Sequence, residues 1–550
     1  MKKSRNRPAL RRLIPYLHSS RALIALLVVL TLLLSAVTMG VSICMKLYLD
    51  IASSAGQYTT WQVTALALVT ITLIGALQLG IGCIRAKVIS RTELAIRTGV
   101  IENAYLGQYP DVESTGPNAY LTRLTSDAQI ASEFVPDVLV GYMMQEIAMM
   151  LLSIALMFAL SRKLTVLFCV LVPVLMLIII KSAGGIEKQI QHMMACEEDN
   201  RRLMTQLLQR NVVFRLYGVF REKLRELSAS YAEKSRARTR LGLMKGVVEF
   251  LNNFMGIGLF VLALGAGTHL ALKNEITIGD TVAIVNLISY LYGPFIHVTD
   301  WIAKTGEARS AAGRIADIQR NVPTQTEDAD ISGAQELSAR GLRFGYTQEK
   351  EVLCGLSLTL QRGEITGITG QNGCGKTTLT YLLIGLYPMQ GGTLLADGRE
   401  IPGIRREDIA YMPNRPQLFQ GTILENVLMG QPFDAERWDR AARDSGLTDV
   451  LAALPKGAET SVSEENSNFS SGQLQRINLA RAFYRDAALY VLDEPDSYLT
   501  QQAIAELMDV LKARAKDRFV LIISHEEAVL NTCDRLYRME NGELLPVHEG

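Results

Sequence analysis

A glycine-rich loop between residues 370 and 377 could bind phosphate. Its sequence, Gly370-Gln-Asn-Gly-Cys-Gly-Lys376-Thr377, fits the pattern GxxxxGK[ST] between a predicted strand, 364–369, and a predicted helix. In such a loop, backbone N–H groups and a helix N-terminus surround the phosphates, the lysine contacts the β- and γ-phosphates, and the hydroxyl binds Mg²⁺. We therefore expect these residues to bind a nucleotide: Gly370, Asn372, Gly373, Cys374, Gly375, Lys376, Thr377 and Thr378.

Two adjacent carboxylates follow a second apolar run. Residues 489–492 are typical of a strand buried on both faces, and Asp493 and Glu494 come directly after it. Ligands of open α/β sheets bind at the carboxyl ends of the strands. We expect Asp493 to hold Mg²⁺ together with Thr377, and Glu494 to polarise the water that attacks the γ-phosphate.

The motifs belong to a predicted α/β domain over residues 336–550. Short β-rich runs alternate there with helical patterns, which is typical of a largely parallel sheet covered by helices. The preceding stretch, 321–335, is polar and contains Pro, Thr and Asp, so we expect it to be a linker.

The first 320 residues are predicted to form an all-α transmembrane domain. Hydrophobic residues make up 49% of the chain and charged residues 20%, a balance that indicates part membrane and part water-soluble protein. A membrane helix needs about 20 mostly apolar residues. Six runs meet this requirement within the predicted domain, 21–320: about 22–45, 62–84, 138–160, 164–183, 247–272 and 279–301. The helix-prone segment 186–240 predicts that the spans continue as helices far beyond the membrane.

Basic residues predict the orientation of the spans. Six of them crowd the N-terminus before the first span: Lys2, Lys3, Arg5, Arg7, Arg11 and Arg12. We expect residues 1–20 to form an interfacial elbow helix on the cytoplasmic side. The long segments 85–134 and 182–245 are rich in Arg, Lys and Glu. By the positive-inside rule we expect them and the nucleotide-binding domain in the cytoplasm of a cell with the chain in its inner membrane. The pair Arg162 and Lys163 is a minor exception.

Other features exclude some classes of function. The net charge of +1 gives no reason to expect a nucleic-acid partner. None of the seven cysteines forms a CxxC pair, so we expect buried small side chains rather than metal or disulfide sites. No peptidase-like segment precedes the first span in this sequence, so we expect no processing of a leader peptide.

The segment Phe469-Ser470-Ser471-Gly472-Gln473 resembles the LSGGQ signature of ATP-binding cassette (ABC) proteins. Along nearly its whole length the chain is similar to an ABC half-transporter of the exporter type, with a six-helix membrane domain fused to one nucleotide-binding domain. The resemblance implies ATP and Mg²⁺ as cofactors, an ATPase coupled to transport, a lipid bilayer around the spans and a second half-transporter as partner. It also implies that four residues clamp the γ-phosphate of the partner's ATP: Ser470, Ser471, Gly472 and Gln473.

Further residues align with the family's nucleotide site. Tyr346 aligns with the aromatic residue that stacks on adenine, and His525 with the catalytic switch histidine that contacts the γ-phosphate. Asn414 aligns with the Q-loop glutamine, which contacts the metal and the water. Residues 497–500 align with the D-loop, and residues 116–127 resemble the first coupling helix.

The sequence departs from the family pattern at several positions. Asn414 is one methylene shorter than glutamine, Ser471 replaces a glycine, and Thr500 replaces the D-loop aspartate. Ser463 and Asn466 also stand where glycine is usual. Most of these positions face the partner's ATP, whereas Lys376 and the catalytic groups face this chain's own ATP. The resemblance therefore favours a heterodimer, with drift in a homodimer as the alternative; Asn414 fits neither cleanly.

Polar residues within the predicted spans are candidates for a substrate cavity. Intramembrane carboxylates are costly and usually face protein or water. The candidates are Glu146, Glu249, Asn253, Asn286 and Tyr290. They could contact a cation or peptide, or simply form hydrogen bonds between helices.

Three hypotheses for function remain open. The first is export of an amphipathic small molecule, peptide or lipid. The second is import of metal–siderophore complexes on the same architecture. The third, of another class, is a degenerate nucleotide-sensing regulatory subunit, which the intact Glu494 and His525 disfavour.

Overall fold

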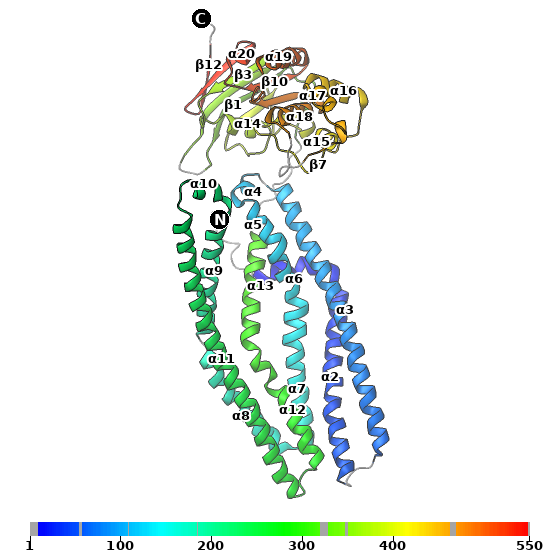
Figure 1. Cartoon of the computed structure of the whole chain (residues 1–550). Coiled ribbons are helices and arrows are strands. Elements are labelled where there is room, and N and C mark those ends of the chain that lie inside the picture. Colours follow the sequence, from blue (N-terminus) through cyan, green and yellow to red (C-terminus); the bar gives the residue numbers. More distant parts are fainter. Residues whose placement is uncertain are drawn as a thin grey trace. The chain divides into compact units, whose positions relative to one another are not determined.

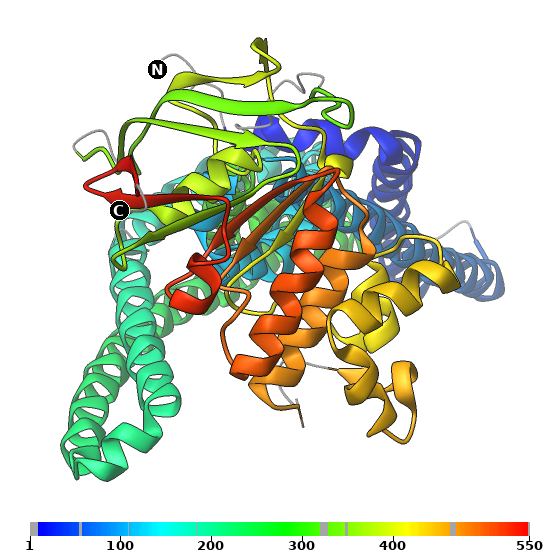
Figure 2. The ribbon, with the colours of Figure 1, turned by 90° about the horizontal axis from the view of Figure 1, so that it is seen from above.

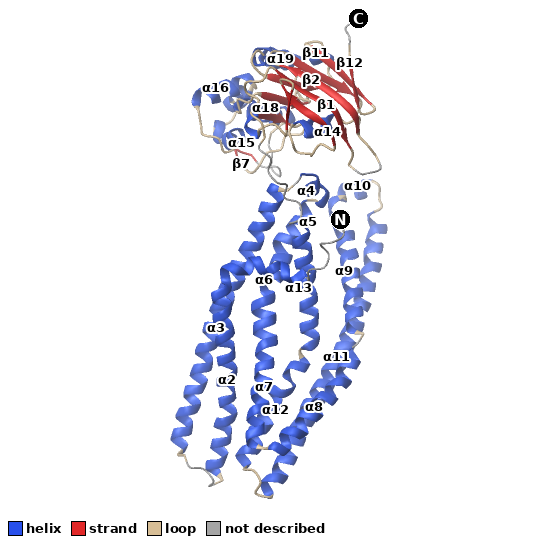
Figure 3. Cartoon of the chain, turned by 180° about the vertical axis from the view of Figure 1, so that it is seen from behind, coloured by secondary structure: helices blue, strands red, loops and turns tan. Residues whose placement is uncertain are grey.

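The computed structural model of the chain describes residues 9–53, 58–107, 109–183, 185–318, 328–346, 350–462 and 469–547. The chain divides into two compact units. Unit 1 comprises Met1–Tyr105 and Gly116–Arg320, and unit 2 comprises Leu106–Thr115 and Asn321–Gly550. The first is helical and the second contains the sheets, as predicted (Figure 3).

Unit 1 is built from long helices (Figure 1). Short helical turns, Ala9–Leu13, α1 (Ile14–Leu17) and His18–Ser20, lead into the first long helix. The helices that follow are α2 (Arg21–Ala52), α3 (Thr60–Leu106), α5 (Pro117–Thr122), α6 (Ala128–Glu133), α7 (Gln145–Leu160), α8 (Arg162–Ala183), α9 (Ile186–Gln209), α10 (Asn211–Leu216), α11 (Phe220–Leu272), α12 (Ile278–Ile296) and α13 (Val298–Ile318). Two π-helical segments, Arg123–Asp127 and Phe134–Met144, interrupt the stretch from α5 to α7.

Five helical stretches among the described residues are long and apolar enough to cross a membrane. They are Ile14–Ala52, Thr60–Leu106, Pro117–Leu160, Phe220–Leu272 and Ile278–Asp317. The remaining predicted span coincides with α8, a helix of 22 residues. The core of unit 1 contains Phe168, Leu259 and Leu287, all buried. Many other large apolar side chains on these helices are exposed, as expected for a surface that faces lipid.

Unit 2 contains two main sheets. The four-stranded sheet is antiparallel in the order β2-β1-β4-β5, and the six-stranded sheet has the order β12-β11-β3-β10-β9-β6. Parallel pairing joins all neighbours of the larger sheet except β11 and β12. The strands are β1 (Glu336–Phe344), β2 (Leu353–Gln361), β3 (Ile365–Gly370), β4 (Gly391–Ala396), β5 (Arg399–Ile401), β6 (Ile409–Met412), β9 (Leu489–Asp493), β10 (Phe519–Ile523), β11 (Arg535–Glu540) and β12 (Glu543–Pro546), with a small pair β7 (Gly421–Thr422) and β8 (Ser461–Val462).

The helices of unit 2 cover the larger sheet, and Figure 2 shows α18 and α19 lying side by side along it. The helices are α4 (Tyr109–Thr115), α14 (Lys376–Leu383), α15 (Ile423–Leu428), α16 (Ala435–Asp444), α17 (Leu447–Ala452), α18 (Ser471–Tyr484), α19 (Gln501–Ala515) and α20 (Glu527–Leu530). The described end of the predicted linker packs in this unit, because Ala329 bridges to Ile404 and Ile331 is fully buried. Residues 321–327 lie outside the described part of the chain.

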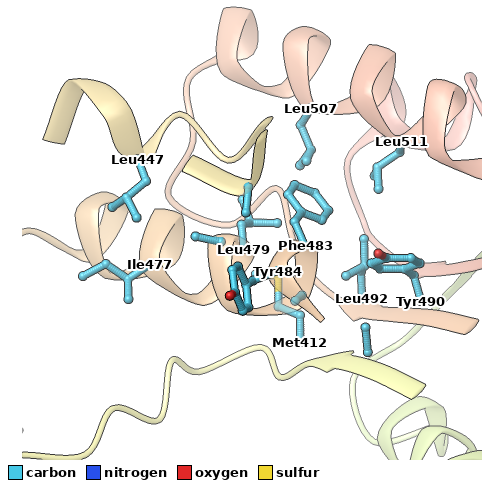
Figure 4. Close-up of a cluster of buried hydrophobic side chains, with 14 of the residues drawn as sticks. Met412, Leu447, Ile477, Leu479, Phe483, Tyr484, Tyr490, Leu492, Leu507 and Leu511 are labelled. Carbon is cyan, nitrogen blue, oxygen red and sulfur yellow. The ribbon is translucent and has the colours of Figure 1, made fainter. Parts of the chain in front are cut away.

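The central strands are buried on both faces, which explains their continuous apolar sequence. Along β9, Tyr490 and Leu492 point into a cluster formed with α18 and α19, whose members include Phe483 and Leu507 (Figure 4). The alternate residues of the same strand belong to the cluster on the other face, which contains β1, β2 and α14. This packing fixes the end of β9, where the two acidic residues emerge.

Candidate functional site

The glycine-rich loop connects β3 to α14. Gly375 is the N-cap of α14 and has a left-handed φ of +114°. An added Cβ there would also lie 3.0 Å from Cε of Met539, so glycine is needed on two counts. Lys376 is buried, and its ammonium donates to the carbonyl oxygens of Gly370 (2.5 Å) and Gln371 (3.1 Å). The loop therefore holds one cation at its centre and the positive end of a helix beside it, a suitable site for phosphates.

Tyr346 lies beside the first turn of α14. Its hydroxyl is 2.9 Å from Oγ1 of Thr378, and its ring meets those of Phe344 and Tyr387 edge-on, at centroid distances of 5.3 and 5.7 Å. The side chain is nevertheless 57% exposed. A ring held at its edge with a free face can stack on a planar base.

The first acid of the pair, Asp493, is buried at the end of β9. Burial, and then the neighbouring Glu494 carboxylate, raise the pKa of Asp493 to about 6, while Lys376 and a hydrogen bond with Thr377 oppose the shift. A cation would relieve this unfavourable pair of carboxylates. The oxygens of Thr377 and Asp493 are the donors that Mg²⁺ prefers, so these residues fit the ion.

The second acid, Glu494, is held by its backbone and by its carboxylate. It has φ of +51°, which is unusual for a residue with a side chain, and its N–H donates to the carbonyl of Ile523 (2.8 Å). Asn414 donates from Nδ2 to Oε2 of Glu494 (2.8 Å), and Ser497 donates from Oγ to the same oxygen (3.4 Å). Nε2 of His525 lies 3.8 Å from the other carboxylate oxygen.

His525 connects this carboxylate to the phosphate loop. The Lys376 ammonium lies 3.1 Å from Nε2 of His525. An ammonium can only donate, so this imidazole nitrogen accepts and the ring proton is on Nδ1. Two hydrogen-bonded pairs, Lys376 with His525 and Asn414 with Glu494, thus lie next to each other. Because its Nδ2 is engaged, Asn414 keeps its side-chain carbonyl available for a metal ion or a water molecule.

The signature-like segment lies at the N-terminus of α18. Ser470 is the N-cap: its Oγ accepts from the N–H of Gln473 (3.3 Å), and its own N–H donates to Oε1 of Gln473 (2.8 Å). A Cβ on Gly472 would lie 3.0 Å from the carbonyl of Tyr498. Ser471 opens the helix. The segment therefore presents a helix N-terminus, the usual backbone site for an anion.

The D-loop position has a comparable structural role. Thr500 is the N-cap of α19, and its hydroxyl accepts from the N–H of Ala503 (3.3 Å). The predicted departures Ser463 and Asn466 lie in 463–468, outside the described residues.

Helix α4 packs within unit 2, on the aromatic residues beside Tyr346. The ring of Tyr109 meets those of Tyr381 and Tyr387 edge-on, at 5.8 and 5.9 Å. The hydroxyl of Tyr387 donates to Glu113, and burial followed by this bond raises the pKa of Tyr387 well above its ordinary value. This helix lies just before the segment 116–127 in which the sequence indicated the first coupling helix.

The candidate cavity residues of unit 1 lie on three helices, α7, α11 and α12. Glu146 lies at the start of α7, 3.8 Å from Nε2 of His297, and a Cβ on Gly293 would lie 2.5 Å from its Oε2. Asn286 accepts a hydrogen bond from Ser42 (2.7 Å), which joins α12 to α2. Tyr290, also on α12, is half-buried.

Glu249 and Asn253 are exposed on α11. Within the described part of the chain, neither makes a hydrogen bond or ion pair with the other three candidates. His297 is the residue that sequence reasoning missed. The sequence signal that could have identified it is Pro294, three residues earlier, which marks the end of α12.

Comparisons with known proteins agree with this division of the chain. The family model for the ABC transporter transmembrane region matches residues 24–295, and the model for the ABC transporter domain matches residues 353–497. The chain is 26% identical to a probable multidrug resistance ABC transporter ATP-binding/permease protein, YheH, of Bacillus subtilis (strain 168), over 77% of this chain. It is 29% identical to the mycobactin import ATP-binding/permease protein IrtB of Mycolicibacterium smegmatis, over 52% of this chain.

The matched region spans less than two thirds of either relative, 64% and 51% of their lengths. Among solved structures, a bacterial Atm1-family ABC exporter with ATP bound has the same fold, with a TM-score of 0.77 and 18% identity. That likeness covers 95% of this chain and 94% of the exporter chain.

Proposed function

Because the chain belongs to the ABC transporters, as a membrane-embedded half-transporter of the exporter type with one transmembrane domain fused to one nucleotide-binding domain, we propose that it hydrolyses ATP to drive transport. The observation that carries the proposal is that Glu494, with its donor Asn414, lies beside the hydrogen-bonded pair Lys376 and His525 of the phosphate site. A site that only sensed nucleotide would not need a carboxylate held at the end of β9 by the side-chain donors Asn414 and Ser497.

The proposed mechanism assigns a task to each group. The glycine loop and Lys376 bind the β- and γ-phosphates, and the exposed face of Tyr346 stacks on the adenine. Thr377, Asp493 and Asn414 would hold Mg²⁺, which neutralises phosphate charge when it is bound. Glu494 orients the attacking water, and the imidazole of His525 lies between Lys376 and that carboxylate.

We also propose a dimer in which this chain's signature-like segment covers the partner's ATP. The helix N-terminus at Ser471 supports that task, since its backbone N–H groups favour an anion. Ser471 in place of glycine and Thr500 in place of aspartate weaken the contact of this surface with the partner's ATP. This asymmetry favours a heterodimer. Basic residues in the segments 85–134 and 182–245 favour a cytoplasmic nucleotide-binding domain at the inner membrane.

Export of an amphipathic small molecule, peptide or lipid is the transport that we favour. The similarity to a relative named for multidrug resistance supports it. The similarity to a relative named for mycobactin import supports the alternative, uptake of a metal–siderophore complex.

Hydrolysis by the full chain in lipid nanodiscs tests the proposal. The chain is assayed with Mg·ATP alone and together with a half-transporter encoded beside it. We expect phosphate release in at least one assembly. Retained ATP binding with no release in either assembly would instead support the nucleotide-sensing alternative. The direction of transport is then tested in inverted membrane vesicles. ATP-driven accumulation of an amphipathic dye inside these vesicles supports export.

A further inference from the structure

We infer that α9 and α11 together carry a binding site for a divalent transition metal of the Zn²⁺ class, separate from the nucleotide site. Three side chains form it: His192 and Cys196 on α9, and Glu233 on α11. Their ligand atoms all lie within 4.8 Å of one another. Neither ATP binding nor transport, as proposed above, uses these residues.

The spacing explains how one helix supplies two of the ligands. Residues four apart in a helix lie on the same face, so His192 and Cys196 project toward the same part of α11. Cys196 is buried where the two helices pack, whereas His192 and Glu233 are exposed. An ion could therefore enter from solvent and reach the thiol at the base of the site.

Asn200 holds the two helices in register at this point. Its Nδ2 donates to the carbonyl of Cys196 (2.9 Å) and to the carbonyl of Ser230 on α11 (3.3 Å). This bridge keeps the turn of α11 that carries Glu233 beside Cys196. A site whose ligands come from two cross-linked helices loses little conformational freedom when it binds an ion.

The neighbouring charges leave the ligands available. Lys234, next to Glu233, pairs instead with Glu197 at 2.5 Å. Among the described residues, the side chains of His192 and Glu233 have no hydrogen-bond or ion-pair partner. The imidazole and the carboxylate are exposed and lie near a thiol. Because Lys234 pairs with Glu197 instead, these groups are available to bind a metal ion.

The donor set selects the kind of metal. Imidazole nitrogen, thiolate sulfur and carboxylate oxygen suit Zn²⁺ and similar ions, whereas Mg²⁺ and Ca²⁺ prefer oxygen donors alone. Bond lengths of about 2.0–2.3 Å around a tetrahedral Zn²⁺ imply ligand atoms roughly 3.3–3.8 Å apart. Small side-chain rotations would reach that spacing from the observed one.

Binding requires one proton to leave. The thiol of Cys196 gives its proton to solvent and becomes the thiolate ligand, His192 binds as the neutral imidazole, and Glu233 binds as the carboxylate. A water molecule fills the fourth position. Glu233 precedes the predicted span at 247 by 14 residues, or about 21 Å of helix, so the site lies in water rather than in the bilayer.

Titration of the full chain in nanodiscs with Co²⁺, a spectroscopic substitute for Zn²⁺, tests the inference. We expect one Co²⁺ per chain, a thiolate-to-metal charge-transfer band in the near ultraviolet, and loss of the band when Zn²⁺ is added. Cys196→Ser should abolish the band, and Cys83→Ser, which removes an exposed thiol on α3, should keep it.

Glu233→Gln should weaken Co²⁺ binding by about tenfold or more, since even loss of an outer partner of a ligand costs that much. Thermal unfolding without metal checks that each variant folds like the parent chain. Absence of the band in the parent chain, or a band that persists in Cys196→Ser, would overturn the inference.

Discussion

The nucleotide-binding unit has two functional surfaces that differ in how their side chains are used. Around the phosphate loop, Lys376 is hydrogen-bonded to His525 and Asn414 to Glu494, and His525 lies 3.8 Å from the Glu494 carboxylate. At the signature-like segment and the D-loop, Ser470 and Thr500 use their hydroxyls to cap helices. The first surface positions groups for chemistry, whereas the second offers helix ends to a phosphate that another chain would hold. The departures from the family pattern at Ser471 and Thr500 fall on the second surface.

The largest effect is expected at the phosphate loop. Lys376→Ala removes the buried cation between the loop carbonyls and His525, so the β- and γ-phosphates lose their closest positive charge. We expect ATP binding by the full chain to be lost in a titration with a fluorescent ATP analogue. Arg535→Ala, which removes a half-buried ion pair with Glu364, serves as a control that should bind normally. Unchanged affinity in Lys376→Ala would mean that the loop does not hold phosphate.

The next largest effect separates binding from hydrolysis. Glu494→Gln keeps the shape of the side chain but removes the charge that activates water. Loss of one such group typically costs a factor of about 10²–10⁴ in rate. We expect ATP affinity to stay near that of the parent chain while phosphate release falls by this factor. Retention of more than half the turnover would contradict the role given to Glu494.

A smaller effect is expected at Asn414. Asn414→Leu preserves the approximate size of the side chain and removes the donor to Glu494. A hydrogen bond to a charged group is worth about 1.5–3 kcal/mol, so turnover should fall by roughly 10- to 100-fold with little change in ATP affinity. Asn414→Gln, which restores the residue usual in the family, should keep most of the activity. Equal turnover in Asn414→Leu and the parent chain would show that this contact does not position the carboxylate.

The smallest effect is expected on the other surface. Ser471→Gly together with Thr500→Asp restores the family pattern and leaves α18 and α19 capped, because aspartate is also a good N-cap. In a heterodimer, this double variant should raise turnover by a few fold only at the site whose phosphate loop belongs to the partner. The matched test combines it with Glu494→Gln, which silences this chain's own site. If the gain in turnover disappears in that background, the double variant acts on this chain's own site, and the heterodimer interpretation is contradicted.

Much of the fold could be predicted because it follows from local pattern. The apolar runs marked the helices of unit 1, and the continuous apolar sequence of β9 and β10 placed Asp493 at the end of a central strand. The glycine loop fixed the start of α14. The confirmed fold class thus rests on periodicity and on short motifs with strict geometry.

The remainder depends on contacts between distant parts of the sequence. The bond from Asn414 to Glu494 joins residues 80 positions apart, and the bond from Tyr387 to Glu113 joins residues 274 apart. No local pattern encodes either contact. The π-helical segment Phe134–Met144 also changes the helical period before α7. A prediction that assumes 3.6 residues per turn throughout therefore cannot give the face of α7 that meets α12. The sequence likewise did not indicate that Glu146 lies beside His297.

The central claim is that this chain supplies an intact hydrolytic site and a weakened surface for its partner's ATP. It is tested most directly by measuring oligomeric state and ATP turnover of the chain alone and with a half-transporter encoded beside it. We predict little turnover from the chain alone, high turnover from the pair, and loss of that turnover when Glu494→Gln is introduced in this chain. A stable homodimer of this chain that hydrolyses ATP at the full rate and transports substrate would contradict the claim.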